Sequence, residues 1–369
     1  MIYQKRIEKV QKILEETRLD AAVITSSPNF FYFCGTWLDS HERLQAIVIP
    51  KFGKAVMVVH EMSKEEIHPT NLFDMVFWKD GDFSLEVLAK VLPENGTISI
   101  DNHWPSQNLL LLMGLKDQLE FVDSRKTIGK ARLNKDPQEV ELLTRSAAIA
   151  DMVMKQIINF IKPGLSEKKV ADELKRLFAL HGVNELSFNP IVGTGRNGAI
   201  PHHQSDDTII AEGDLVVIDM GGIKDHYCSD MTRTVLAGGE ATKEMKKVFD
   251  LVKYAHEEAV KAVKPGVSLK EIDLTAREII RKEGYGPNFT HRTGHGLGIE
   301  VHEEPFVTSD NDQLLEEGMV ISIEPGIYLS GQFGVRIEDI VLVTESGSKS
   351  FNNVTRTLIN TVSGEALTV

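Results

Sequence analysis

The segment Val217–Thr234 reads VIDMGGIKDHYCSDMTRT and carries two aspartates, Asp219 and Asp230, in a pattern typical of a β-hairpin. If the chain turns between Lys224 and Asp225, the two carboxylates lie directly opposite each other. Cβ atoms so opposed are roughly 5 Å apart, and like charges at that separation destabilise a sheet. The pair therefore predicts a site at which a positive charge stands between two acids.

A second acidic pair follows in the segment VISIEPGIYLSGQFGVRIEDIVLV, Val320–Val343, where Glu324 and Glu338 are symmetric about Gly331. Two β-rich runs around a glycine-containing loop predict another hairpin, with these two glutamates facing each other. Four buried anions cannot coexist without partners, because desolvation costs several kcal/mol per ion. Two divalent cations would balance their charge, so we predict a binuclear metal centre.

Histidines supply further donors near these acids. The stretch HRTGHGLGIEVHEEP contains His291, His295 and His302, and the motif Pro201–His203 precedes the first hairpin. His291 and His295 are four residues apart, a spacing that would place both on one helical face. The interspersed glycines instead favour an irregular loop, and a glycine-rich segment with three histidines is a candidate part of an active site.

Other chemistries fit the sequence less well. The run GTGRNG, Gly193–Gly198, lacks the Lys-Ser/Thr pair of a phosphate-binding P-loop. There is no GxSxG nucleophile motif, and neither Cys34 nor Cys228 lies in a recognisable nucleophile context. Two cysteines cannot form a disulfide framework, so we interpret them as reduced thiols.

The acidic pairs follow the two copies of an internal repeat. Residues 162–182 and 264–284 align without a gap at an offset of 102, and share Lys-Pro-Gly, a serine and a closing glycine. In each copy the serine, Ser166 or Ser268, can cap a new helix, and the glycine can end it. Matching start and stop residues favour duplication over chance resemblance. Related halves normally pack about a pseudo-two-fold axis, which would bring the four carboxylates together.

The chain is expected to contain two domains. A helical pattern from Ile7 to Leu19, a buried strand at Ala21–Thr25 and later Val- and Ile-rich runs predict a small α/β domain at residues 1–128. A charged segment poor in apolar residues then leads into the duplicated domain, residues 129–369, which opens with a long helix from Pro137 to about Ile161. The fold class is α+β.

Composition narrows the partners. The net charge of -13 disfavours nucleic acid and anionic membranes, because both require basic faces that release counterions. No apolar run approaches the ~20 residues that span a bilayer, and the amphipathic N-terminus has no apolar signal-peptide core. We therefore expect a cytoplasmic protein.

At this point the residues resemble a known family, the "pita-bread" metallopeptidases of family M24, and within it the Xaa-Pro branch that contains proline dipeptidase (prolidase) and aminopeptidase P. The motifs are IDMGG, SDMTRT, HRTGHGLG, SIEPGIY and RIED. The resemblance covers nearly the whole chain and implies a creatinase-like N-terminal domain before a pseudo-two-fold duplicated catalytic domain. The metal ligands it implies are Asp219, Asp230, His295, Glu324 and Glu338.

The resemblance also implies substrate-side roles for His202, His291 and His302, with Tyr328 and Arg336 in support. His202 rather than its neighbour His203 is chosen because it lies 17 residues before Asp219, the interval found in the family.

The implied reaction is hydrolysis of Xaa-Pro peptide bonds by a metal-bridging hydroxide, with Glu324 as the proton shuttle. His291 and His302 would hydrogen-bond the carbonyl or the developing oxyanion. Arg336 would orient the ligand shell, although a plain structural ion pair is nearly as good an interpretation. A carboxylate-rich shell with one imidazole favours two Mn²⁺ ions, with Co²⁺ or Zn²⁺ also able to bind.

Three alternatives stay open. Aminopeptidase P, acting on longer peptides, shares every ligand with the dipeptidase, which we favour because the N-terminal domain is compact. Methionine aminopeptidases generally lack such a preceding domain. A metal-free creatinase-like hydrolase or binding module is expected to have lost several ligands, whereas all five positions are filled here. The resemblance further indicates a homodimer in which the N-terminal domain helps to close the site.

Overall fold

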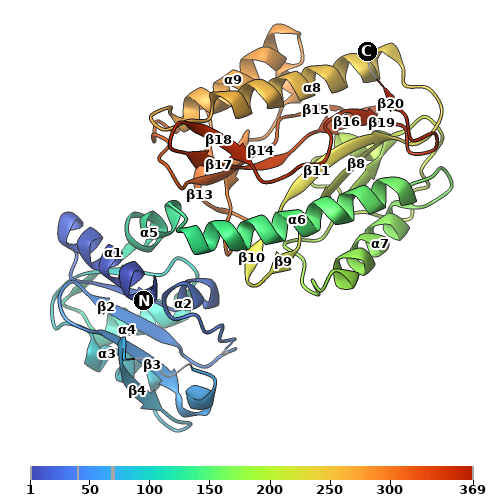
Figure 1. Cartoon of the computed structure of the whole chain (residues 1–369). Coiled ribbons are helices and arrows are strands. Elements are labelled where there is room, and N and C mark those ends of the chain that lie inside the picture. Colours follow the sequence, from blue (N-terminus) through green and yellow to red (C-terminus); the bar gives the residue numbers. More distant parts are fainter. Residues whose placement is uncertain (1, 40, 68–70, 368–369) are drawn as a thin grey trace. The chain divides into compact units, whose positions relative to one another are not determined.

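The computed structural model describes residues 2–39, 41–67 and 71–367. The chain folds as two compact units, which we name the N-terminal unit, Met1–Arg132, and the C-terminal unit, Leu133–Val369 (Figure 1). The domain boundary expected between residues 128 and 129 falls inside the helical turn Arg125–Gly129, at the end of the N-terminal unit.

The N-terminal unit is a six-stranded mixed sheet with the strand order β4-β3-β2-β1-β5-β6. Strand β1 is fully buried near the middle of the sheet, which fits the short apolar run expected there. The elements that build the unit are α1 (Ile2–Thr17), β1 (Ala21–Ile24), α2 (Ser27–Cys34), β2 (Ala46–Pro50), β3 (Ala55–His60), β4 (Phe73–Trp78), α3 (Ser84–Val91), β5 (Gly96–Ile100), α4 (Ser106–Leu115), β6 (Leu119–Asp123) and α5 (Lys130–Leu133).

The C-terminal unit holds its strands between two pairs of helices, α6 with α7 on one side and α8 with α9 on the other (Figure 1). Its helices are α6 (Pro137–Phe160), α7 (Glu167–Leu180), α8 (Lys243–Ala262) and α9 (Leu269–Lys282). Its strands are β7 (Ile191–Thr194), β8 (Leu215–Met220), β9 (Ile223–Lys224), β10 (Tyr227–Cys228), β11 (Met231–Leu236), β12 (Gly294–Gly296), β13 (Glu303–Val307), β14 (Val320–Ile323), β15 (Gly326–Leu329), β16 (Phe333–Arg336), β17 (Asp339–Thr344), β18 (Gly347–Ser350), β19 (Leu358–Ile359) and β20 (Ala366–Leu367).

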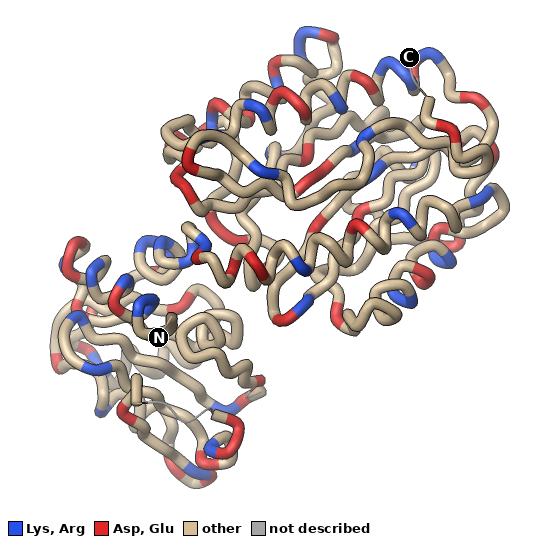
Figure 2. Tube along the Cα trace, viewed as in Figure 1, with Lys and Arg blue, Asp and Glu red and all other residues tan. Residues whose placement is uncertain are grey.

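Each half of the C-terminal unit has its own apolar core. Helices α6 and α7 pack on the sheet β11-β8-β7, and helices α8 and α9 pack on strands that include β14 and β17. Acidic residues lie mostly on helices and loops, interspersed with basic ones, but a few lie on the strands between the helix layers (Figure 2). Those interior acids need a physical explanation, since a charge between packed layers is desolvated.

The predicted duplication is visible in the backbone. The Ser166 side chain caps α7 by accepting from the Lys169 N–H, and Ser268 caps α9 in the same way. The turn before each helix makes matching hydrogen bonds to a later loop, from Gly164 to Ile210 in the first half and from Gly266 to Leu315 in the second. Both halves therefore repeat one helix–loop scaffold.

The register expected for the first hairpin is wrong. The chain turns at Asp225 and His226, both with positive φ, which is the backbone of a two-residue type I′ turn. Asp219 consequently lies opposite Thr232, and continuing this register places Gly221 opposite Asp230. The two aspartates are diagonal neighbours on one face and not a directly opposed pair.

The register expected for the second hairpin is confirmed. Ile323 pairs with Asp339 and Gly326 pairs with Arg336, so Glu324 and Glu338 face each other about the turn at Gly331. The histidine-containing loop contains one surprise, because Gly294–Gly296 forms the short strand β12 between β13 and β14. The glycines permit this close packing, since a Cβ at Gly294 would lie 1.9 Å from the Ser322 carbonyl oxygen.

Candidate metal centre

Residues from both halves meet in one cavity of about 930 Å³ in the C-terminal unit. Nine of the ten site residues expected from the sequence line it, and the tenth, Tyr328, lies behind them in contact with two of the nine. The nine are His202, Asp219, Asp230, His291, His295, His302, Glu324, Arg336 and Glu338.

His295 lies at the centre of the acidic group. Its Nε2 atom is 3.4 Å from Glu324 Oε1 and 3.7 Å from Asp230 Oδ2. One ligand atom each from Asp230, His295 and Glu338 lies within 4.8 Å of the other two, and all three residues are buried. Such a set of oxygen and nitrogen donors is compact enough to share one divalent ion.

The backbone also fixes the tautomer of His295. Its Nδ1 atom lies 3.0 Å from the carbonyl oxygen of Gly296, so Nδ1 carries the proton and donates it to that carbonyl. The lone pair on Nε2 then points at the acids, as metal-ligating histidines require. Ser322 supports the arrangement, because its hydroxyl accepts from the His295 N–H and donates to Glu324 Oε1.

Asp219 is held by a chain of polar contacts. The Arg336 guanidinium donates to Asp219 Oδ2 at 2.6 Å and to the Tyr328 hydroxyl at 2.8 Å. The Tyr328 hydroxyl in turn lies 2.8 Å from His291 Nε2, and the other ring nitrogen of His291 lies 2.7 Å from the Arg292 carbonyl oxygen. Both nitrogens of His291 thus already have protein partners.

Thr232 links the two halves at this point. Its hydroxyl donates to Glu338 Oε2 at 2.7 Å and accepts from Arg336 Nε at 3.1 Å. The adjacent Arg233 donates to the main-chain carbonyls of Thr232 and Glu338, at 2.8 and 2.7 Å. The candidate ligand Glu338 is therefore fixed through both its side chain and its backbone.

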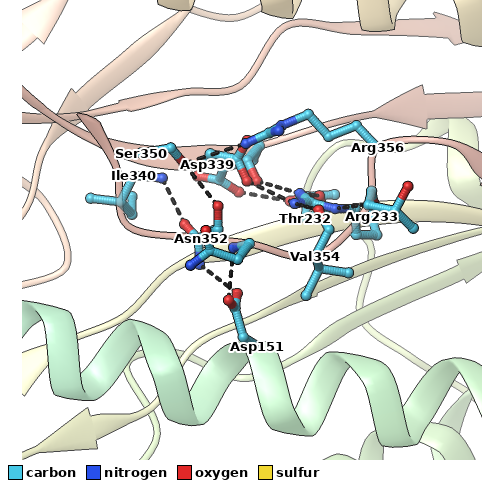
Figure 3. A network of polar contacts seen from close by, with 12 residues as sticks. Asp151, Thr232, Arg233, Asp339, Ile340, Ser350, Asn352, Val354 and Arg356 are labelled. Atoms are coloured by element: carbon cyan, nitrogen blue, oxygen red, sulfur yellow. Dashed lines mark hydrogen bonds and ion pairs between the residues drawn. The ribbon is translucent and has the colours of Figure 1, made fainter. Parts of the chain in front are cut away.

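A buried ion-pair network stands behind this contact (Figure 3). Arg233 donates to Asp339 Oδ1 at 2.7 Å, and Arg356 donates to the other carboxylate oxygen of Asp339. Burial alone would raise the pKa of Asp339, but Arg233, His256 and Arg356 outweigh it and hold that pKa below its usual value. Asp339 follows Glu338 directly, so the network holds the strand end that presents a candidate ligand.

Burial and mutual repulsion dominate the electrostatics of the cavity floor. Burial, reinforced by Glu338 and Asp219, holds the pKa of Asp230 well above its usual value, and burial with Glu324 and Asp219 does the same for Glu338. Burial, reinforced by Asp219, raises the pKa of Glu324 to about 7. Among the described residues, Arg336 is the guanidinium that forms an ion pair with this group, and it offsets only part of the negative charge.

These residues fit divalent metal ions. Among the described residues, Asp219 Oδ1 and Asp230 Oδ1 are buried oxygens with no hydrogen-bond partner. A buried carboxylate oxygen without a donor is costly unless a cation neutralises it. Burial and the nearby His302 also lower the pKa of His295 to about 3, which keeps the imidazole in the neutral form that binds metal.

The side chains of the two adjacent histidines, His202 and His203, have different contacts. Both line the cavity, but His203 Nε2 lies 2.6 Å from the carboxylate of the buried Glu167. His202 makes no side-chain hydrogen bond to any other described residue, so its ring is available to a ligand.

Sequence reasoning missed Thr232, Ser322 and Glu167. Thr232 lies two residues after Asp230, which directly precedes β11, and Ser322 lies two residues before Glu324, which directly follows β14. The period-two pattern of these strands could have indicated both. Glu167 carried no such signal, because its partners come from a later loop.

Comparisons with known proteins identify the family of this chain. The model of the metallopeptidase family M24 matches residues 141–345, and that of the creatinase/prolidase N-terminal domain matches residues 6–134. The chain belongs to metallopeptidase family M24. The resemblance and the fold class inferred from the sequence are thereby confirmed, and the chain is a hydrolytic metallopeptidase.

Several relatives of this M24 enzyme are close along their whole length. An uncharacterized peptidase of Staphylococcus aureus is 39% identical over 347 residues, 92% of this chain and 97% of that protein. The crystal structure of a prolidase from Thermococcus sibiricus is 36% identical, with a TM-score of 0.91 over 98% of this chain and 99% of that chain. An X-Pro aminopeptidase from Thermotoga maritima is 30% identical, with a TM-score of 0.80 over 94% and 99%.

M24 enzymes use paired divalent metal ions, and the carboxylate and histidine cluster is the candidate site for them in this chain. Within the described residues, no helix combines the length and the apolar character needed to cross a bilayer.

Proposed function

We propose that this M24 enzyme hydrolyses dipeptides of the Xaa-Pro type at a centre of two divalent metal ions. The supporting observation is the convergence of five donor residues from both halves on one cavity, where two buried carboxylate oxygens lack partners. The proposed ligands are Asp219, Asp230, His295, Glu324 and Glu338. When bound, the two ions supply Lewis-acid activation of a water molecule and of the scissile carbonyl.

Glu324 is the proposed proton shuttle. Its side chain is 16% exposed, against 6% for Asp230, so it is the more open of the two carboxylates beside His295. A carboxylate at the cavity surface can accept a proton from water and release it to the leaving nitrogen. Ser322 restrains one oxygen of Glu324 and leaves the other free for this transfer.

The histidines divide into two groups. No side-chain hydrogen bond of His202 or His302 is recorded among the described residues, so both can donate to the substrate carbonyl or to the oxyanion that develops on it. His291 was expected to make the same contact, but to do so it must give up Tyr328 or Arg292. We therefore propose that His291 mainly holds the Tyr328–Arg336–Asp219 chain in place.

A bond before proline suits this centre. The Xaa-Pro amide nitrogen carries no hydrogen, so a protease that must hydrogen-bond that proton is handicapped. In the proposed mechanism, His202 and His302 act on the carbonyl and Glu324 acts on the leaving nitrogen. Neither contact needs an amide N–H.

Metal-free protein with Mn²⁺, Co²⁺ and Zn²⁺ added back separately tests the proposal. We expect cleavage of the dipeptide Ala-Pro, with the highest rate in Mn²⁺ because most ligands are carboxylates. Glu324→Gln should lower kcat by roughly 10³-fold or more while the protein stays folded, because an amide cannot carry the proton. An active Glu324→Gln enzyme, or no cleavage with any metal, would refute the proposal.

An Xaa-Pro aminopeptidase is the second candidate. The similarity to the X-Pro aminopeptidase of Thermotoga maritima favours it, as does a cavity of about 930 Å³, since pockets of this size take ligands much larger than a dipeptide. Comparing Ala-Pro with a tripeptide such as Ala-Pro-Ala separates the two activities. Cleavage of the tripeptide alone would favour the aminopeptidase.

The homodimer implied by the resemblance stays a prediction, which sedimentation of the full chain tests.

A further inference from the structure

Glu167 is a fully buried acid that belongs to none of the roles above. It is the first residue of α7, directly after the capping Ser166, and its side chain has no exposed area. The N-terminal end of a helix carries partial positive charge, which favours a carboxylate there. That preference alone does not explain complete burial, which also requires hydrogen-bond partners.

All partners of the Glu167 carboxylate come from one later segment, Thr194–Asp206. Its Oε1 atom accepts from the Thr194 N–H at 2.8 Å and from Asn197 Nδ2 at 3.0 Å. Its Oε2 atom accepts from His203 Nε2 at 2.6 Å and from the Asp206 N–H at 3.2 Å. Each oxygen of the Glu167 carboxylate thus accepts two hydrogen bonds, and together they hold both ends of the segment against α7.

The clamped segment carries His202. Pro201, His202 and His203 all line the cavity, and His202 is the member of the segment proposed to bind substrate. Because His203 is bonded to Glu167, the backbone of the preceding residue is held at a fixed distance from α7. An ordered anchor of this kind reduces the entropy that His202 loses when substrate binds.

We propose that Glu167 and His203 are positioning residues that fix the Thr194–Asp206 segment, and through it set the affinity for the peptide substrate by orienting His202. This inference rests on the proposed peptidase function. Within the described residues, neither Glu167 nor His203 makes a hydrogen bond or ion pair with a proposed metal ligand, so the pair acts on substrate binding and not on the metal centre.

A pair of variants at His203 tests the inference. His203→Leu removes the donor to Glu167, whereas the amide of His203→Gln can still donate from nearly the same place. With Ala-Pro as substrate in Mn²⁺, we expect His203→Leu to raise KM by roughly tenfold with a much smaller change in kcat, and His203→Gln to lose far less. The Mn²⁺ affinity of both variants, measured by titration calorimetry, should equal that of the wild type.

A double-mutant cycle identifies the route of the effect. If the anchor acts through His202, adding His203→Leu to a His202→Ala enzyme should raise KM no further, because the positioned group is already absent. Full additivity of the two changes would overturn the inference, and so would an unchanged KM in His203→Leu. A Mn²⁺ affinity that falls together with kcat would also overturn it, since that result would mean that the metal centre itself had been disturbed.

The second half supplies a matched control. Asn311 lies in the loop that packs on the start of α9, and its side chain donates to the Phe306 carbonyl at 2.7 Å, but it does not line the cavity. Asn311→Ala should leave KM unchanged. An increase in KM equal to that of His203→Leu would reduce the proposed role to general loop stability.

Hydrogen exchange keeps the inference separate from the proposed function, because it needs no substrate. Glu167→Gln should speed exchange at the Thr194 or the Asp206 amide, since an amide keeps an accepting oxygen at only one of the two positions. Unchanged exchange at both Thr194 and Asp206 would refute the anchor even in an active enzyme. Absence of any Xaa-Pro cleavage by the wild-type protein would refute the proposed function instead, and with it the role of the anchor in substrate affinity.

Discussion

Each half of the C-terminal unit holds a histidine-bearing segment against a helix through a buried acid, and the two halves use different residues for it. In the first half, buried Glu167 on α7 fixes the segment that carries His202. In the second, buried Asp273 on α9 accepts from the N–H and the hydroxyl of Thr293, between the two histidines of the HRTGH motif. Each half therefore ties a histidine-bearing segment to its second helix through one buried acid.

The two anchors are not equivalent positions of the repeat. In the gapless alignment Glu167 corresponds to Leu269, and Asp273 corresponds to Ala171. The duplication thus accounts for the helices, caps and loop contacts, whereas the polar anchors occupy different positions in the two copies. Helix geometry makes this possible, because several buried positions of one helical face can reach the same neighbouring segment.

A second difference distinguishes anchors from ligands. Asp273 is as buried as any residue of the metal centre, yet both its oxygens receive hydrogen bonds, including two from Arg277 at 2.8 Å. Asp230 is also buried, but its Oδ1 has no partner. Burial of an acid therefore does not identify a metal site. The oxygen without a donor is what distinguishes the candidate ligand Asp230 from Asp273.

The largest effect is expected at the centre that the halves share. Asp230→Asn from the first half and Glu338→Gln from the second should each lower hydrolysis of Ala-Pro on the order of 10³-fold, because an amide is a weaker ligand than a carboxylate. Mn²⁺ should raise the melting temperature of the wild type by mass action and that of either variant much less. Steady-state kinetics and calorimetry measure both. Loss of activity in only one of the two variants would mean that one half holds the metal alone.

A smaller effect is expected at the second anchor. Asp273→Ala leaves Arg277, whose side chain is 26% exposed, without its ion-pair partner, and leaves Thr293 without an acceptor. We expect the free energy of unfolding to fall by about 2–3 kcal/mol, less than the loss for a fully buried ion pair, because the exposed part of Arg277 can be hydrated. Urea titration measures the change. A loss below about 1 kcal/mol would show that Asp273 is not the anchor that its contacts indicate.

The smallest effect compares the repeated caps. Ser166→Ala and Ser268→Ala each remove one hydrogen bond to a first-turn N–H, at 3.3 and 3.1 Å. Each change should cost about 1 kcal/mol, with little difference between the halves. Because the Ser166 helix begins with Glu167, the same two variants can be assayed for KM. A large increase in KM for Ser166→Ala but not for Ser268→Ala would mean that Ser166 also helps to position the segment that carries His202.

The two hairpins show how far sequence reasoning reached. The register of Glu324 and Glu338 was predicted correctly because Gly331, at φ 74, marks the turn. The register of the first hairpin was not, because its turn uses Asp225 and His226 at positive φ, where no glycine marks the position. The two-residue turn sets that register, and Gly222 permits the close packing beside it, since a Cβ there would lie 2.7 Å from the Phe178 ring.

The sequence alone determined the capped helices of the repeat, the duplication and the chemical types of the candidate ligands, because capping residues and spacing are local. Only the tertiary structure decided which oxygens lack a donor, and that His203 is an anchor whereas His202 faces the cavity without a recorded bond. The physical reason is that hydrogen-bond satisfaction and burial depend on neighbours brought from distant parts of the chain, as Thr232 is to Glu338 and Glu167 to Asp206.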